Sequence, residues 1–372
     1  MTAATAGEPP ADPLPDLVGT PDPEIGPEAD RAAAALRALA RREDLKAAVL
    51  DSPAAYAALR RAGARYVAGE TRDEALSTTS DLARFGHRTT VDHMGEDTRD
   101  PVAARAATDE FLSLVAALGA DGDGAAPAGT SVSLDLSHIG LAVPQGGPAL
   151  ATGHLAEIAR AAGAAGREVM IGMEGSERTR AILDAHAAVA PDHPHVGITL
   201  QAALHRSDAD LDTALARPGR VRLVKGAYAE PGAVAHPRGD ALDAAYARLA
   251  ARLVAAAAEG HPVSVATHDP ALLSSVLRDV EARGGAAGVP GLEIEMLHGV
   301  RADRLAAVAA RGLPTRVYLV YGREWWLYLC HRLAEHPPGL LGTLADAVEA
   351  LAGPPAPVGD RMVAASARPG RA

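Results

Sequence analysis

The sequence predicts an α/β protein folded as a parallel (β/α)8 barrel. Eight short β-rich runs begin at residues 88, 130, 167, 196, 220, 262, 292 and 315, and each is followed by an Ala- and Leu-rich stretch with helical spacing. Alternating strand and helix patterns favour a parallel sheet, and the span 85–352 matches the roughly 250 residues of such a barrel. A doubly wound open sheet is the alternative, but no GxGxxG follows any run.

The chain outside the barrel divides into three segments. Residues 1–30 are rich in Pro and acids and lack the basic start and apolar centre of a signal peptide, so we expect a disordered tail there. Residues 31–84 place Leu36, Leu39, Leu45 and Val49 at helical spacing and are predicted to form a helical arm. Residues 353–372 are expected to be a second flexible tail.

Composition limits the function. A net charge of −11 argues against binding to nucleic acid, which needs clustered basic residues, and points to small-molecule partners. The single cysteine, Cys330, excludes an intramolecular disulfide and a multi-cysteine zinc site. No stretch reaches the roughly 18 apolar residues of a spanning helix. We therefore expect a cytoplasmic protein, with at most peripheral contact at the inner membrane face.

The run VRLVKGAY, residues 221–228, indicates a ligand site. In a barrel, chemistry belongs at the carboxyl ends of the strands, and this run places Arg222, Lys225 and Gly226 there. The two cations suit an anionic or electron-rich ligand, and Gly226 permits close backbone approach. The alternative is a barrel strand whose basic residues face the solvent.

Two further segments support this site. The run VATHD places Thr267 and His268 after the sixth strand, where they could bind phosphate or ribose. In the segment 321–336, Trp325, Tyr328 and Arg332, with Glu335, are three or four residues apart and share one helix face. Such a helix could close over a pocket and hold a carboxylate, although its charges could instead pair with each other.

The ordered segments RYVAGET, VDHMGE, VRLVKGAY, VATHD, MLHGV and RVYLVYGREWWLYLCHRLAE resemble the proline dehydrogenase family of flavin enzymes over roughly residues 60–340. The resemblance implies a distorted (β/α)8 barrel that binds FAD noncovalently at its carboxyl face. It implies hydride transfer from the carbon beside the ring nitrogen of proline to flavin N5. The product would be 1-pyrroline-5-carboxylate, and the electrons would pass to a quinone or another acceptor.

Matching positions imply three sets of site residues. The catalytic set is Arg222, Tyr318, Arg332 and Glu335. The cofactor set is Gln201, Arg222, Val224, Gly226, Ala227, Thr267, His268, Asp269 and Glu335. The substrate pocket would be lined by Tyr228, Leu297, Tyr318, Tyr328 and Arg332.

Three pocket positions depart from the family pattern. Asp135 stands where the family has a lysine, Gly172 where it has an aspartate, and His331 where it has the first of two arginines. Because these positions would contact the substrate carboxylate, the sequence predicts a proline-like cyclic or secondary amine with a masked carboxylate or an extra cationic group. Compensation by a neighbouring Arg or His is the alternative.

Two other functions stay open on the sequence alone. His93, His138, His268 and His298 lie near strand ends beside carboxylates, as in a metal-dependent barrel hydrolase, although there is no HExxH motif. A catalytically silent flavin-binding relative is the other alternative.

Overall fold

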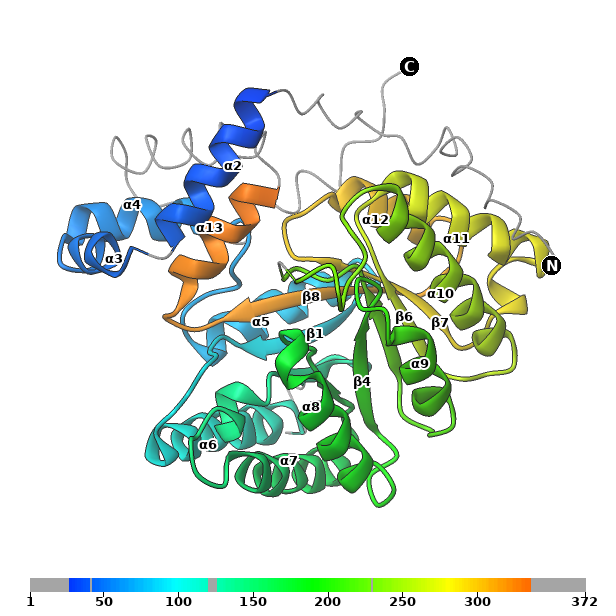
Figure 1. The fold of residues 1–372 in the computed structure, drawn as a ribbon, viewed down its shortest axis with the longest axis horizontal. Coiled ribbons are helices and arrows are strands. Elements are labelled where there is room, and N and C mark those ends of the chain that lie inside the picture. Colours follow the sequence, from blue (N-terminus) through cyan, green and yellow to red (C-terminus); the bar gives the residue numbers. More distant parts are fainter. Residues whose placement is uncertain (1–26, 41, 120–125, 229, 336–372) are drawn as a thin grey trace.

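The computed structural model describes residues 27–40, 42–119, 126–228 and 230–335. The strands are β1 Arg88–His93, β2 Ser131–Leu134, β3 Val169–Ile171, β4 Val196–Gln201, β5 Val221–Val224, β6 Val263–Ala266, β7 Leu292–Leu297 and β8 Thr315–Tyr321. They form one closed parallel barrel in sequence order, with β8 paired to β1. The predicted eight-stranded barrel is confirmed (Figure 1).

Helices follow the strands in turn. They are α6 Pro101–Leu118, α7 Gly147–Ala164, α8 Ser176–Val189, α9 Ser207–Leu215, α10 Asp240–Ala258, α11 Pro270–Ala282, α12 Ala302–Ala309 and α13 Trp325–Glu335, with short turns η1 Ser137–Leu141 and η2 Gly285–Gly288. Local sequence sets several of their starts. Asp100 accepts two backbone N–H bonds at the start of α6, and Asp269 does the same for α11; each is followed by a proline suited to the first helical position.

The predicted arm is helical. It comprises α2 Pro27–Ala40, α3 Glu43–Leu50, α4 Pro53–Gly63 and α5 Arg72–Arg84. Helix α5, which begins with a capping box between Thr71 and Glu74, contacts β1 and β8 and covers their seam. The last arm helix is therefore part of the barrel wall. The predicted tails lie mostly outside the described residues, although α2 already begins at Pro27.

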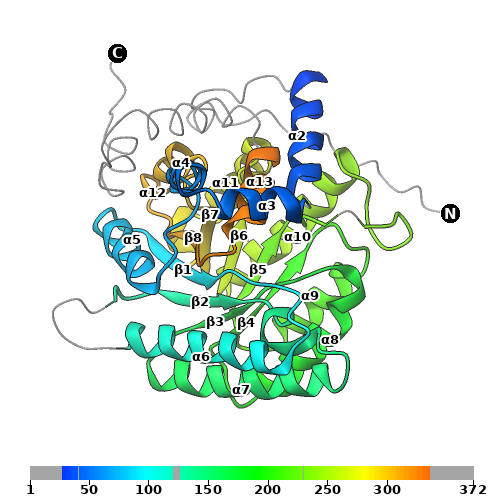
Figure 2. The ribbon, with the colours of Figure 1, turned by 90° about the vertical axis from the view of Figure 1, so that its left-hand side faces the viewer.

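Helix α13 packs on the arm rather than along the barrel wall. Figures 1 and 2 both show it beside α2, on the same side of the barrel as α3 and α4. A buried apolar cluster joins the two parts and includes Ala40, Tyr66, Trp325, Trp326 and Leu329. Among the helices that the structure describes, none combines the length and apolar character needed to cross a membrane.

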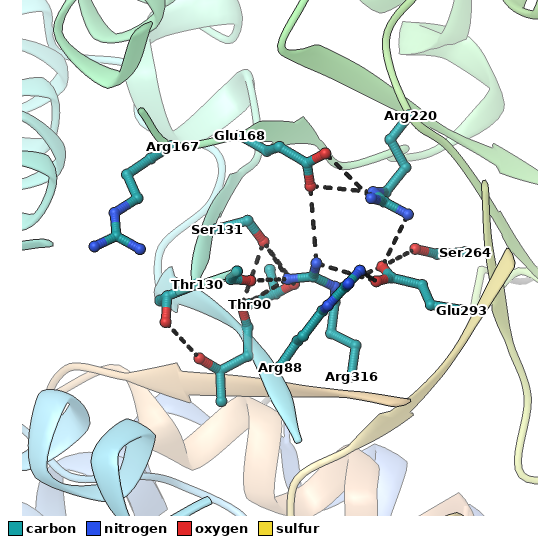
Figure 3. Close-up of polar contacts among 12 residues, drawn as sticks. Arg88, Thr90, Thr130, Ser131, Arg167, Glu168, Arg220, Ser264, Glu293 and Arg316 are labelled. Atoms are coloured by element: carbon teal, nitrogen blue, oxygen red, sulfur yellow. Dashed lines mark hydrogen bonds and ion pairs between the residues drawn. The ribbon is translucent and has the colours of Figure 1, made fainter. Parts of the chain in front are cut away.

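A buried ionic network closes the amino end of the barrel (Figure 3). Arg316 lies 2.6 Å from Glu293, and Arg220 lies 3.2 Å from the same carboxylate. Arg220 also pairs with Glu168 at 3.1 Å, and Arg316 donates to Ser131 at 2.8 Å. Because these side chains come from the first positions of their strands or from just before them, they lie opposite the end where barrel sites form.

Candidate active site

Arg222 lies inside the barrel, with only 5% of its surface exposed. Its Nε donates to Thr199 Oγ1 on β4 at 3.0 Å, and its guanidinium pairs with Glu295 on β7 at 3.1 Å and donates to Ser133 on β2 at 3.3 Å. Three strands therefore fix this cation. The ion pair and hydrogen bonds offset the cost of burying its charge.

Tyr318 and Asp92 complete this group. The guanidinium carbon of Arg222 lies 5.0 Å from the centroid of the Tyr318 ring, and the Tyr318 hydroxyl donates to the Asp92 carboxylate. Burial raises the pKa of Asp92 to about 7, and the Tyr318 hydrogen bond and the charge of Arg222 only partly oppose this shift. Asp92 therefore changes its charge near neutral pH.

Gln201 and Gly226 form a cradle beside Arg222. The Gln201 amide nitrogen donates to the backbone oxygen of Glu174 at 2.7 Å. Its Oε1 is buried and has no hydrogen-bond partner in the described part of the chain. Gly226 has φ +108°, and a Cβ added there would lie 2.8 Å from this oxygen. Glycine at 226 thus satisfies a backbone need and keeps the space beside Gln201 open.

The predicted cofactor residues after β6 are held in hydrogen bonds. Thr267 Oγ1 accepts the Asp269 N–H at 3.1 Å, and the Asp269 carboxylate caps α11. His268 Nε2 accepts the backbone N–H of Leu297 at 3.2 Å, which ties the end of β6 to the end of β7. These hydrogen bonds hold the loop after β6 in one conformation at the carboxyl end of the barrel.

Lys225, the second cation of the VRLVKGAY run, has different partners from Arg222. Its Nζ lies 2.6 Å from Asp243 and 3.1 Å from Asp269. Burial opposes its charge, but these two carboxylates outweigh burial and raise the pKa of Lys225. Val224, before it, is half-buried, and the Ala227 carbonyl accepts from Arg238 at 3.0 Å. Arg222 and Lys225 therefore interact with different sets of residues.

Asp135 and Gly172, two of the departures, are in contact. Asp135 follows β2 and Gly172 follows β3, and a Cβ added at Gly172 would lie 1.9 Å from Asp135 Oδ1. Burial raises the pKa of Asp135 well above its ordinary value, and the charges of Asp92 and Glu174 add to the shift. The two departures thus form one local unit.

The last helix supplies the remaining predicted residues. On α13, Tyr328 and Arg332 are half-buried, and the Arg332 guanidinium carbon lies 5.1 Å from the Tyr328 ring centroid. His331 is exposed. Glu335 ends the helix, but its side chain lies outside the described residues. Tyr228, in the loop after β5, is 39% exposed and close enough to Asp135 to feel its charge.

The described histidines near the strand ends pack on other rings or bond to the backbone. Across the described ranges, no three His, Cys, Asp or Glu side chains are placed to hold an ion. The rings of His93 and His138 lie 5.3 Å apart and pack on Phe111, while His268 bonds to a backbone N–H and His298 is buried. This arrangement does not favour the hydrolase alternative.

Sequence reasoning did not assign four polar residues of this site: Asp92, Ser133, Thr199 and Glu295. A signal for them exists. Side chains two residues apart on a barrel strand point to the same side, and β7 carries Glu293 and Glu295 at this spacing within an otherwise apolar run. Charged residues at such positions must find partners inside the barrel.

The sequence was compared with known proteins. The model of the family described as proline dehydrogenase matches residues 75–336. Proline dehydrogenase of Deinococcus radiodurans is 34% identical over 275 residues, which cover 73% of this chain and 86% of that protein. Proline dehydrogenase 2 of Bacillus subtilis is 29% identical over 279 residues, covering 75% of this chain and 88% of that protein.

Solved structures agree on the fold. Proline utilization A from Bdellovibrio bacteriovorus matches 78% of this chain with a TM-score of 0.65 and 22% identity, and that from Bradyrhizobium japonicum matches 80% with a TM-score of 0.61 and 25% identity. The match spans only 35% of each of those longer chains. The family model over residues 75–336 and the relative from Deinococcus radiodurans show that the chain belongs to the proline dehydrogenase family.

Proposed function

We propose that this protein is an FAD-dependent oxidoreductase that acts on the CH–NH group of proline or a proline-like cyclic amine. The observation that carries this proposal is Arg222, a buried cation fixed by three strands inside a barrel whose sequence belongs to this family. A buried, rigid positive charge suits a reaction in which negative charge develops on a bound ring system.

The residues present fit a flavin. Gln201 Oε1 is a buried acceptor that lacks a partner among the described residues, and a ring N–H would satisfy it. The missing side chain at Gly226 leaves room beside that oxygen. Gln201, Arg222, Val224, Gly226 and Ala227 would hold the ring. The loop Thr267 to Asp269, and Glu335, would complete the cofactor site.

When bound, FAD supplies the acceptor for a hydride from the carbon beside the substrate nitrogen. That C–H bond gives up two electrons, the nitrogen loses its proton, and a C=N bond forms. Arg222 would hold its positive charge beside the ring and favour its gain of electrons, and Tyr318, Leu297 and the α13 pair Tyr328 and Arg332 would wall and orient the amine. We propose a quinone as the electron acceptor and a cytoplasmic location with peripheral contact at the inner membrane face.

The test is the spectrum of the purified protein followed by anaerobic titration with proline and related cyclic amines. We expect flavin absorbance that bleaches on addition of an amine. Flavin that dithionite reduces but no amine reduces would support a silent flavin-binding relative instead. A protein that binds no FAD when it is supplied in excess would contradict the proposal.

A further inference from the structure

The carboxyl of Asp135 occupies the space that a side chain at residue 172 would fill. Its Oδ1 lies 1.9 Å and its Cγ 3.1 Å from the ideal Cβ position of Gly172. Real Cβ atoms do not approach other atoms this closely, so any other residue at 172 would displace the carboxyl. Glycine at 172 and aspartate at 135 therefore act together to place a carboxyl at the mouth of the barrel.

Two other carboxylates at this mouth already have cations. Glu295 pairs with Arg222 at 3.1 Å, and Glu174 pairs with Arg178 at 2.6 Å. Both carboxylates are almost completely buried. The positive charges of Arg222 and Arg178 are thus balanced by the protein itself.

Asp92 and Asp135 are two further carboxyls at this mouth. Asp92 accepts the Tyr318 hydroxyl, while no described residue hydrogen-bonds to the Asp135 carboxyl, and no described cation forms an ion pair with either. Burial raises the pKa of both groups, and the charge of Asp92 adds to the shift of Asp135. A substrate carboxylate placed here would add a further negative charge to a region where the ionisation of Asp92 and Asp135 is already unfavourable.

A second observation, a buried acceptor unpartnered in the described part of the chain, points to a ligand at this mouth. Gln201 is 2% exposed, and its amide nitrogen donates to the backbone oxygen of Glu174, next to the end of β3. Its Oε1 has no partner among the described residues. Buried acceptors are normally satisfied, so this oxygen indicates a group that binds beside Asp135 and Gly172.

We infer that the contact between Asp135 and Gly172 sets the substrate class: a cyclic secondary amine whose ring substituent carries no negative charge. This inference rests on the proposed function. A neutral carbonyl substituent accepts a hydrogen bond from the protonated form of Asp135, and a cationic substituent pairs with its ionised form. The ionised form of Asp135 repels a free carboxylate, and a hydrogen bond from the protonated form still leaves a net negative charge among carboxyls that have no ion-pair partner in the described part of the chain.

The first experiment compares ligands. The flavin-loaded protein is mixed anaerobically with proline, prolinamide, pyrrolidine and 2-(aminomethyl)pyrrolidine, and the rate of flavin bleaching is recorded. In parallel, calorimetry measures binding of tetrahydrofuran-2-carboxylate and tetrahydrofuran-2-carboxamide, which have no N–H to oxidise. We expect the carboxamide to bind at least about tenfold more tightly than the carboxylate. A tenfold ratio is what a charge interaction that shifts a pKa by about one unit would produce.

The outcomes separate the two proposals. If no amine bleaches the flavin but the carboxamide still binds more tightly, the proposed oxidation fails and the inferred ligand class holds. If the carboxylate binds as tightly as the carboxamide, the inferred class is overturned even when proline bleaches the flavin. Proline bleaching faster than all three other amines overturns it as well.

The second experiment changes the charge without changing the shape. Asp135→Asn should reduce the preference for carboxamide over carboxylate by about tenfold, because it removes the charge and keeps the volume. The matched control is Asp192→Asn, the same chemical change at an exposed carboxyl in the loop before β4, which should leave the preference unchanged. Flavin absorbance and the thermal midpoint confirm folding. An unchanged preference in Asp135→Asn would overturn the inference.

Discussion

The two ends of the barrel contain the same kinds of side chain but treat their charges in opposite ways. At the amino end, Arg316 and Arg220 surround Glu293; burial would raise the pKa of Glu293, but the two cations outweigh it and lower the pKa to about 2. At the carboxyl end, burial raises the pKa of Asp92 to about 7. The difference is the supply of cations, since Arg222 is already paired with Glu295.

This contrast separates stability from function. An ionic network fixes one end of the barrel, whereas Asp92 and Asp135 at the other end have no ion-pair partner among the described residues, and burial disfavours their charged forms. Four changes test the contrast, from the largest expected effect to the smallest.

Glu293→Gln should disrupt the ionic network at the amino end of the barrel. It replaces the carboxylate between Arg316 and Arg220 by a neutral amide and leaves only Glu168, which is 36% exposed, as their carboxylate partner, so we expect a loss of about 3–5 kcal/mol in the free energy of unfolding. Urea denaturation measures the change. A loss below about 1 kcal/mol would show that the network does not stabilise the barrel. The preference among amines should not change, because the network lies opposite the site.

Arg222→Lys should disrupt the contacts that fix the buried cation at the carboxyl end of the barrel. Lysine keeps a charge but cannot reach Thr199, Ser133 and Glu295 together, so we expect the rate constant of flavin reduction by amine to fall by about 100-fold. Stopped-flow absorbance of protein with matched flavin content measures it. The control is Arg180→Lys, a highly exposed arginine on α8. A rate equal to that of the wild type would remove Arg222 from the mechanism.

Asp92→Asn should change how stability depends on pH. The folded pKa of Asp92 is about 7 and the ordinary value is 3.8, so its stabilisation is complete below 3.8 and is lost as the pH rises through 7. We expect on the order of 2–4 kcal/mol to be lost from pH 4 to 8, at about 1.4 kcal/mol for each unit of pKa shift.

Burial also raises the pKa of Asp135, which keeps part of that slope. Asp92→Asn should reduce the slope in urea midpoints measured across this range. Asp192→Asn, an exposed loop position, should not. The opposite sign is expected of Glu293, whose stabilisation is present above 4.5 and is lost as the pH falls towards 2. Equal slopes in the wild type and Asp92→Asn would contradict the assigned role of burial.

Glu168→Gln should have the smallest effect. Its side chain is 36% exposed, and its pair with Arg220 at 3.1 Å is open to solvent, so we expect a loss of about 0.5–1 kcal/mol in urea denaturation. Because Glu168 belongs to the same network as Glu293, the comparison isolates the effect of burial. Equal losses in the two variants would mean that burial does not decide the energy of these pairs.

The strands could be predicted from sequence because each is a short apolar run bounded by turn residues. The contact of Asp135 with Gly172 could not, because it depends on the register of β2 and β3, which pairs Leu134 with Ile171. Closure of the whole barrel, rather than any local pattern, sets that register.

Helical spacing gave the correct face for Tyr328 and Arg332 but not the surroundings of Trp325. The spacing grouped all three, yet the Trp325 ring lies 5.8 Å from that of Tyr56 and donates to Glu70 at 3.0 Å, both on the arm side. Periodicity indicates which residues share a face and says nothing about what covers it. The roles of the cofactor and substrate residues remain predictions for the experiments above.

The packing of α13 on α2 links the helix that carries Tyr328 and Arg332 to the first helix that the structure describes. Trp325, Trp326 and Leu329 are buried against arm residues such as Ala40 and Tyr66, so moving α13 alone would expose this apolar surface to water. Helix and arm should therefore move as one rigid unit. A tag, truncation or fusion near α2 would therefore shift α13 and, through it, the proposed substrate pocket.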